Sequence, residues 1–163
     1  MHFRNRQASI ASRNKVFTIL WLALLASVGI YAVIAFSVIP GSEAAPPDDA
    51  DTMTIIFGVV AMSTASASMV LPKVLLSDDK LKAHLQNEAG SAEERLESIG
   101  ALYFPAWLIG VALAESVAIF GLVLAFVMDD PRFMVPFAVV AALLIVVKRP
   151  NLAAVIERAK NLS

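Results

Sequence analysis

The chain has 163 residues, of which 58% are hydrophobic and only 17% charged, and its formal net charge is −1. A soluble domain of this length would carry more charge, so the composition favours a membrane protein. The chain has no cysteine, which excludes disulfides and thiolate metal sites, and both histidines lie outside the apolar stretches. We expect neither a metal site nor a cofactor.

The first predicted element is a membrane span from Val16 to Ile39, preceded by a basic tail of residues 1–15. A helix crosses the hydrocarbon core with about 20 apolar residues. A basic region followed by an apolar run also resembles a secretory signal, and residues 40–45 could pass for a cleavage site. The apolar run is longer than that of a usual signal, so we expect an uncleaved span.

The second predicted span runs from Met53 to Leu71, with Pro72 at its end. Its middle consists almost entirely of small residues, which allow helix backbones to approach closely in lipid. We expect this small-residue surface to be buried, either inside one bundle or between protomers. The small residues singled out are Ala61, Ser63, Thr64, Ala67 and Ser68, and they include the four-residue pairs Ser63 with Ala67 and Thr64 with Ser68.

The polar loop of residues 73–100 separates the second and third spans. Its leucines recur near helical spacing, and a serine followed by two glutamates predicts a helix start at Ser91. We therefore expect two helical extensions joined at Asn87–Ser91. They form either a docking hairpin for a soluble partner or a solvated connector, and the connector is the preferred interpretation.

The third predicted span, Leu102–Met128, contains Glu115, the one charged residue within the apolar spans. A charge at bilayer depth is costly, so such residues usually face a bundle interior or an ion path. With no cation at its depth, we expect this carboxyl to be protonated at neutral pH. Candidate hydrogen-bond partners at similar depth are Ser27, Ser63 and Thr64, and Ser116 is its neighbour. Tyr103, Phe104 and Trp107 indicate an interfacial belt.

The fourth predicted span is Phe133–Val147, which is short. The tail of residues 148–163 follows it and is weakly amphipathic. We expect this tail either to continue the helix or to lie in the interface. The residues that share its apolar face are Leu152, Val155, Ile156 and Ala159.

The basic residues fix the expected orientation. All Lys and Arg residues except Arg132 lie in the N-terminal tail, the loop of residues 73–100 and the C-terminal tail. By the positive-inside rule these segments, and both termini, are cytoplasmic. We expect an all-α integral protein of a bacterial cytoplasmic membrane, with four transmembrane helices in residues 16–147, surrounded by lipid and binding no nucleic acid.

The apolar spans also resemble one another in pairs. The segment Ser27–Ile34 is similar to Ser116–Val123, and Phe57–Ala61 is similar to Phe137–Ala141. Such similarity is consistent with two related helical hairpins, which is a common plan for membrane transport proteins.

The sequence ALAESVAIFGLVLAF at residues 112–126 resembles the ion-binding helix of the c subunit, or proteolipid, of rotary F-/V-type ATPases. Asp130–Pro131 follows where that family often has Asn-Pro. The resemblance covers about residues 52–131, and its specific part is residues 112–131. The chain departs from the family in its two extra spans, its long loop and Phe120 in place of a tyrosine. Gly121, within the same motif, is an expected helix-packing position.

The resemblance implies a proton-translocating, c-type membrane subunit in a homo-oligomeric ring or a larger complex, which could serve a rotary-type ATPase without being catalytic itself. The ion site would contain Glu115 with Ser116, Ser63, Thr64 and Ser27. Proton is preferred over sodium because the second span lacks a glutamine. The alternative is a noncatalytic four-helix structural or regulatory subunit in which Glu115 is a neutral packing residue. No catalytic residues are expected.

Overall fold

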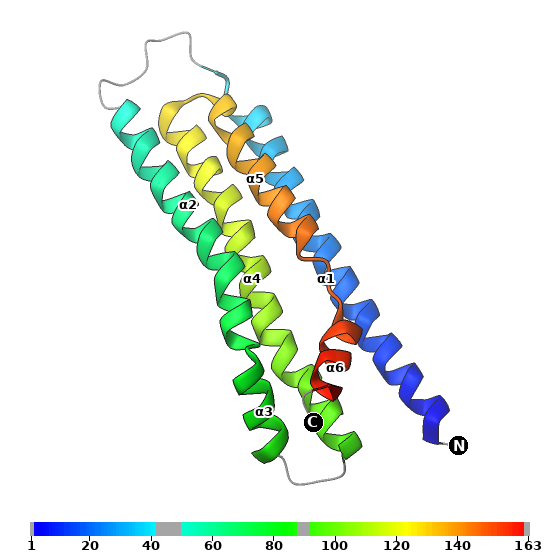
Figure 1. Cartoon of the computed structure of the whole chain (residues 1–163). Helices are drawn as coiled ribbons and strands as arrows, with labels where there is room; N and C mark the ends of the chain where they lie inside the picture. Colours follow the sequence, from blue (N-terminus) through cyan, green and yellow to red (C-terminus); the bar gives the residue numbers. More distant parts are fainter. Residues whose placement is uncertain (1, 42–49, 88–91, 162–163) are drawn as a thin grey trace.

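The computed structural model describes residues 2–41, 50–87 and 92–161, and its side chains within residues 14–41, 50–86 and 98–161. In this part of the chain every regular element is a helix (Figure 1). The elements are α1 (His2–Val38), α2 (Ala50–Leu75), α3 (Asp78–Asn87), α4 (Ala92–Met128), the 3-10 helix η1 (Pro131–Phe133), α5 (Met134–Val147) and α6 (Leu152–Lys160). The all-α prediction is confirmed.

Three segments are long and apolar enough to cross a membrane: Asn14–Val38, Ala50–Gln86 and Ser98–Met128. A fourth exists if Pro131–Val147 and Leu152–Lys160, which are bent by 46° relative to each other, form one broken span. These segments contain the predicted spans almost completely. Hydropathy located them because a bilayer requires a continuous apolar length.

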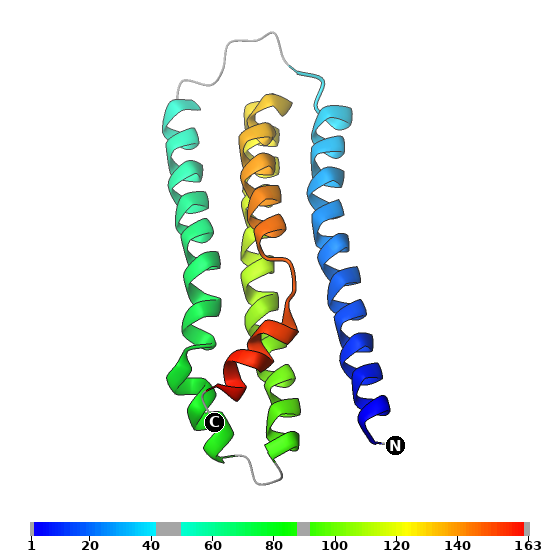
Figure 2. The same cartoon turned by 45° about the vertical axis from the view of Figure 1, so that its right-hand side comes forward.

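The long helix α4 lies at the centre of the bundle. It packs against α2, against α5 and against α1, and α1 also packs against α5. Figure 2 shows α2 and α1 on opposite sides of the α4–α5 pair. The first two spans therefore do not pack together as a hairpin, which differs from the expected plan of two related helical hairpins.

Two glycines of α4 explain its central position. A Cβ at Gly110 would lie 2.6 Å from Cγ of Pro72 in α2, and a Cβ at Gly121 would overlap the Phe137 side chain of α5. Because neither glycine carries a side chain, α2 and α5 can both approach the α4 backbone. The structure thus places Gly121 at a close helix contact, as expected for a packing residue.

The small-residue surface of α2 is divided between two sides of the helix. Ala61 and Ser68 are buried towards α4, whereas Ser63 is exposed. Thr64 and Ala67 are half-buried. Small residues lie all around α2, but α4 covers one face of it. Among the described residues, the predicted close contact is therefore made by the face that is turned towards α4.

Replacing Gly121 by Ala should lower the thermal stability of the protein in detergent. The added methyl group would overlap Phe137, and overpacking of this kind typically costs about 1–3 kcal/mol. Gly29→Ala is the matched control, because no heavy atom lies within 4 Å of the position its Cβ would occupy. Equal melting temperatures for the two variants would contradict the close α4–α5 contact.

Helices α3 and α6 and the beginning of α4 form a second, smaller cluster, which we call the three-helix end. Its buried core residues are Leu81, Leu85, Ile99 and Ala159. Arg158 of α6 forms a salt bridge of 2.6 Å with Asp78 of α3. The two predicted helical extensions are therefore confirmed as α3 and the start of α4, while the predicted helix start at Ser91 lies outside the described residues. The apolar face of α6 packs into the protein, since Leu152 is buried.

Candidate functional site

Glu115 lies on α4 at the seam with α1 and is half-buried. A helix rises about 1.5 Å per residue, so Glu115 is about 20 Å from the end of α4 at Met128 and about 12 Å from Trp107. The hydrocarbon core is about 30 Å thick. Glu115 therefore lies deep within an apolar segment, Ser98–Met128, that is long enough to cross such a layer.

Two hydroxyl groups of α1 bind the carboxyl group of Glu115. Ser27 Oγ donates to Glu115 Oε1 at 2.5 Å, and the Tyr31 hydroxyl donates to the same oxygen at 3.0 Å. Ser27 and Tyr31 lie one helical turn apart, so they present their hydroxyls on one face of α1. The site is thus a carboxyl with two neutral donors.

The arrangement can hold Glu115 in either protonation state. Ser27 Oγ has a second acceptor, the carbonyl oxygen of Leu24 at 2.8 Å. When the carboxyl is ionised, Ser27 and Tyr31 can both donate to it. When it is protonated, it can donate to Ser27, whose own hydrogen then goes to Leu24, because a hydroxyl both donates and accepts. Changing state requires hydrogens to reorient and no helix to move.

The other predicted site hydroxyls are not joined to Glu115. Ser63 and Thr64 donate to the Val59 and Val60 carbonyls of their own helix, at 2.8 and 2.9 Å. Ser116 likewise donates to Ala112 at 3.0 Å. A hydroxyl in apolar surroundings commonly bonds the carbonyl one turn back. In addition, α2 lies on the other side of α4 from α1, so similar depth did not bring its hydroxyls to the site (Figure 2).

Tyr31 is the site residue that the sequence analysis missed. It supplies a phenol hydroxyl, the group that Phe120 lacks in the family-like motif. Its spacing was the available signal, because a residue one turn from Ser27 shares that residue's helix face. Once Ser27 is a candidate partner of Glu115, Tyr31 becomes one as well.

Aromatic residues hold the end of α5 in place. Trp21 Nε1 donates to the Ile145 carbonyl at 2.7 Å, and Trp107 Nε1 donates to the Lys148 carbonyl at 2.9 Å. Tyr103 accepts a hydrogen bond from the Asn151 amide at 3.1 Å. Ile145 and Lys148 lie at the end of α5, where carbonyls lack the amide four residues further on, and the Ile145 carbonyl also accepts from the Lys148 amide at 3.1 Å. The predicted aromatic belt residues pack with one another and with Phe17.

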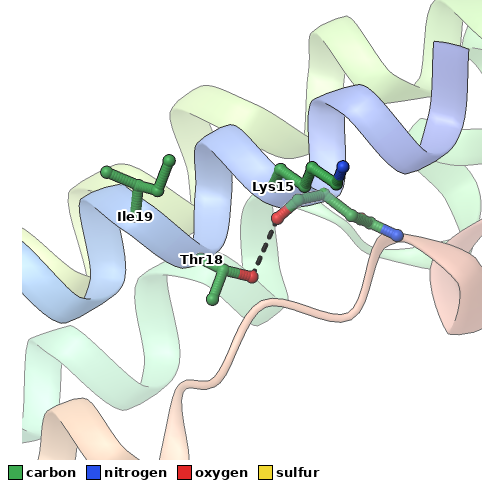
Figure 3. A pocket seen from close by; sticks show the side chains of 4 residues that line it. Lys15, Thr18 and Ile19 are labelled. Atoms are coloured by element: carbon green, nitrogen blue, oxygen red, sulfur yellow. Dashed lines mark hydrogen bonds between the residues drawn. The ribbon is translucent and has the colours of Figure 1, made fainter.

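An open pocket of about 330 Å³ lies along α1, beside the connection from α5 to α6 (Figure 3). Asn14, Lys15, Thr18 and Ile19 line it, and Thr18 donates to the Asn14 carbonyl at 2.8 Å. Thr18 precedes Ser27 by about 13 Å along the helix. This pocket is therefore separate from the carboxyl site.

No family model, curated protein or solved structure matches this chain.

Proposed function

We propose that the chain is a proton-translocating membrane subunit of the proteolipid type, in which the Glu115 carboxyl takes up and releases one proton. The observation that supports this proposal is the pair of hydroxyl donors, Ser27 and Tyr31, on a single carboxyl deep within a candidate membrane span. This pairing can stabilise both the ionised and the neutral carboxyl, which a group that loads and releases a proton requires.

Proton rather than sodium is the proposed ion. A sodium ion needs several oxygen ligands around the carboxylate, in the manner of other hard cations. Among the described side chains, only the Ser27 and Tyr31 hydroxyls are hydrogen-bonded to Glu115. A proton needs no such shell, so the observed partners suit it better.

We place the site in a four-helix membrane domain of a bacterial cytoplasmic membrane, with both termini and the three-helix end in the cytoplasm. The distribution of basic residues supports this orientation. In this topology α5 is the fourth span. Its 14 residues extend about 21 Å, less than a full hydrocarbon core. Lys148 directly follows α5, at the proposed membrane boundary.

The proposed subunit works in a homo-oligomeric ring or a larger complex. Buried apolar side chains line the α1–α4 seam on either side of Glu115, among them Ala35, Val111 and Ala118. These described side chains offer a proton no hydrogen-bonding group in the part of the seam next to Glu115. Exchange with water requires groups from another subunit, which would reach the half-exposed side of Glu115.

A noncatalytic structural or regulatory subunit is the second candidate. The same two hydrogen bonds favour it, because they join α1 to α4 and would stabilise the bundle with Glu115 permanently neutral. The two candidates differ in whether the proton on Glu115 exchanges.

The first test of the proposal is chemical labelling of the intact protein in lipid. A hydrophobic carbodiimide, which modifies protonated carboxyls in apolar surroundings, should label Glu115 selectively and faster as the pH falls. Asp129 and Asp130, which follow α4 in the chain, are internal controls that should remain unlabelled. Mass spectrometry of the labelled peptides reads the result. Labelling that is absent at Glu115, or independent of pH, would contradict proton exchange at this site.

A further inference from the structure

Pro72 removes one backbone hydrogen bond from the interior of α2. Proline has no amide hydrogen, so the carbonyl one turn earlier, that of Ser68, loses its helical donor. The helix continues beyond this point, since the Leu76 amide donates to the Pro72 carbonyl at 3.0 Å. Ser68 is fully buried, and an unpaired carbonyl is costly in apolar surroundings.

The side chain of Lys148 occupies the position of the missing donor. Its ammonium nitrogen Nζ donates to the Ser68 carbonyl oxygen at 2.6 Å and lies 3.5 Å from the Met69 sulfur. A hydrogen bond from a charged donor is stronger than one between neutral groups. Lys148 therefore supplies, from the end of α5, the hydrogen bond that α2 cannot supply itself.

The close approach of α4 leaves little room for another donor at this carbonyl. A Cβ on Gly110 would lie 3.3 Å from the Ser68 oxygen as well as 2.6 Å from Pro72. The α4 backbone thus packs directly on the turn of α2 that contains Pro72. The Lys148 ammonium approaches the carbonyl from the α5 side, and Lys148 is half-buried there.

The contact lies beside both breaks that separate the membrane helices from the three-helix end. The chain leaves α2 for α3 shortly after Pro72, and it leaves α5 for α6 at Lys148, with a bend of 46°. Lys148 is also held through its own carbonyl by Trp107 of α4. One residue thus joins α2, α4 and α5 at the level where the chain enters the three-helix end.

We propose that Lys148 is a positioning residue that replaces the amide hydrogen removed by Pro72, and that this contact fastens the three-helix end to the membrane helices. The Lys148 ammonium thus makes a specific contact, in addition to being one of the basic residues that indicate the orientation in the membrane. Burial lowers the pKa of Lys148, and neighbouring Lys73 adds to this effect. A half-buried ammonium is stabilised by a nearby acceptor, and the Ser68 carbonyl supplies one.

A double-mutant cycle on the full chain in detergent tests the hydrogen bond. Lys148→Met removes the ammonium and leaves the Ser68 carbonyl unpaired, so the melting temperature should fall by about 5 °C. Pro72→Ala restores an amide hydrogen to α2. In the Pro72→Ala background, Lys148→Met should therefore lower the melting temperature by less than half as much as it does in the parent. Lys73→Met, which removes an exposed cation beside Pro72 that repels Lys148, is the control and should not lower the melting temperature. An equal fall in melting temperature in the parent and in the Pro72→Ala background would overturn the pairing of Lys148 with the Ser68 carbonyl.

A distance measurement tests the fastening role. Because the chain has no cysteine, spin labels can be placed at two exposed positions alone, Met62 in α2 and Ala153 in α6. The distribution of label-to-label distances should be narrow in the parent. It should be broad in Lys148→Met, with or without the additional Pro72→Ala substitution, because either chain lacks the ammonium that joins α5 to α2. An unchanged narrow distribution would overturn the proposal.

The cycle remains decisive even when the single variant does not fold. In that case the Pro72→Ala/Lys148→Met double variant should fold, because the alanine amide again provides a donor for the Ser68 carbonyl. A double variant that also fails to fold would overturn the proposal, because the loss would then be independent of that carbonyl.

Discussion

Glu115→Gln should leave the bundle folded and abolish proton transfer, with a loss of about 100-fold or more. Gln retains an Oε1 acceptor of the same shape, so Ser27 and Tyr31 can still donate to it. The Gln side chain cannot take up or release a proton. This single substitution therefore tests the loss of proton transfer without a loss of folding.

The measurement is proton uptake into inverted membrane vesicles from the native host, with the variant replacing the parent. Glu115→Leu is the contrasting variant, because it removes the acceptor and leaves the Tyr31 hydroxyl without its carboxyl partner. Glu115→Leu should lower the free energy of unfolding by about 1–3 kcal/mol, whereas Glu115→Gln should not. If Glu115 is only a packing residue, the Gln variant will retain full activity.

Removing both hydroxyl donors should produce the second-largest effect. In the Ser27→Ala/Tyr31→Phe variant, the Glu115 carboxylate loses the two hydrogen bonds that stabilise its charge. A hydrogen bond to a charged group contributes about 1.5–3 kcal/mol, so the protonated form gains population at a given pH. Carbodiimide labelling of Glu115 at a mildly alkaline pH should therefore become at least about tenfold faster.

Ser116→Ala is the matched control for this experiment. Ser116 is adjacent to Glu115 in the sequence, but its hydroxyl donates to the Ala112 carbonyl of its own helix. Its removal should leave the labelling rate unchanged. A Ser27→Ala/Tyr31→Phe variant that labels at the parental rate would show that the two hydroxyls do not govern the carboxyl.

The sequence predicted the helices well because their signal is local. A continuous apolar length defines each span, and an isolated carboxylate within one of them identified Glu115. Ser27 was also predictable, because residues at the middle of two spans lie at similar depth. Pro72 was expected to end the second span, whereas α2 continues to Leu75. A proline removes one hydrogen bond, and an outside donor can replace it.

What could not be predicted is how the helices are arranged around one another. Depth gives a position along the membrane normal but not the direction in which a side chain points. For this reason Ser63 and Thr64 were predicted at the site although α2 lies on the other side of α4 from α1. The Lys148 contact with Ser68 was likewise hidden, because it joins residues far apart in the sequence.

The measurement that tests the central claim most directly is an infrared pH titration of the intact protein in lipid. We expect a protonated carboxyl band that disappears reversibly as the pH rises, and that is absent at every pH in Glu115→Gln. Such a band would assign an exchangeable proton to Glu115. A parental spectrum in which no carboxyl band differs from that of Glu115→Gln, or in which the Glu115 band persists unchanged at all pH values, would contradict proton translocation at this site.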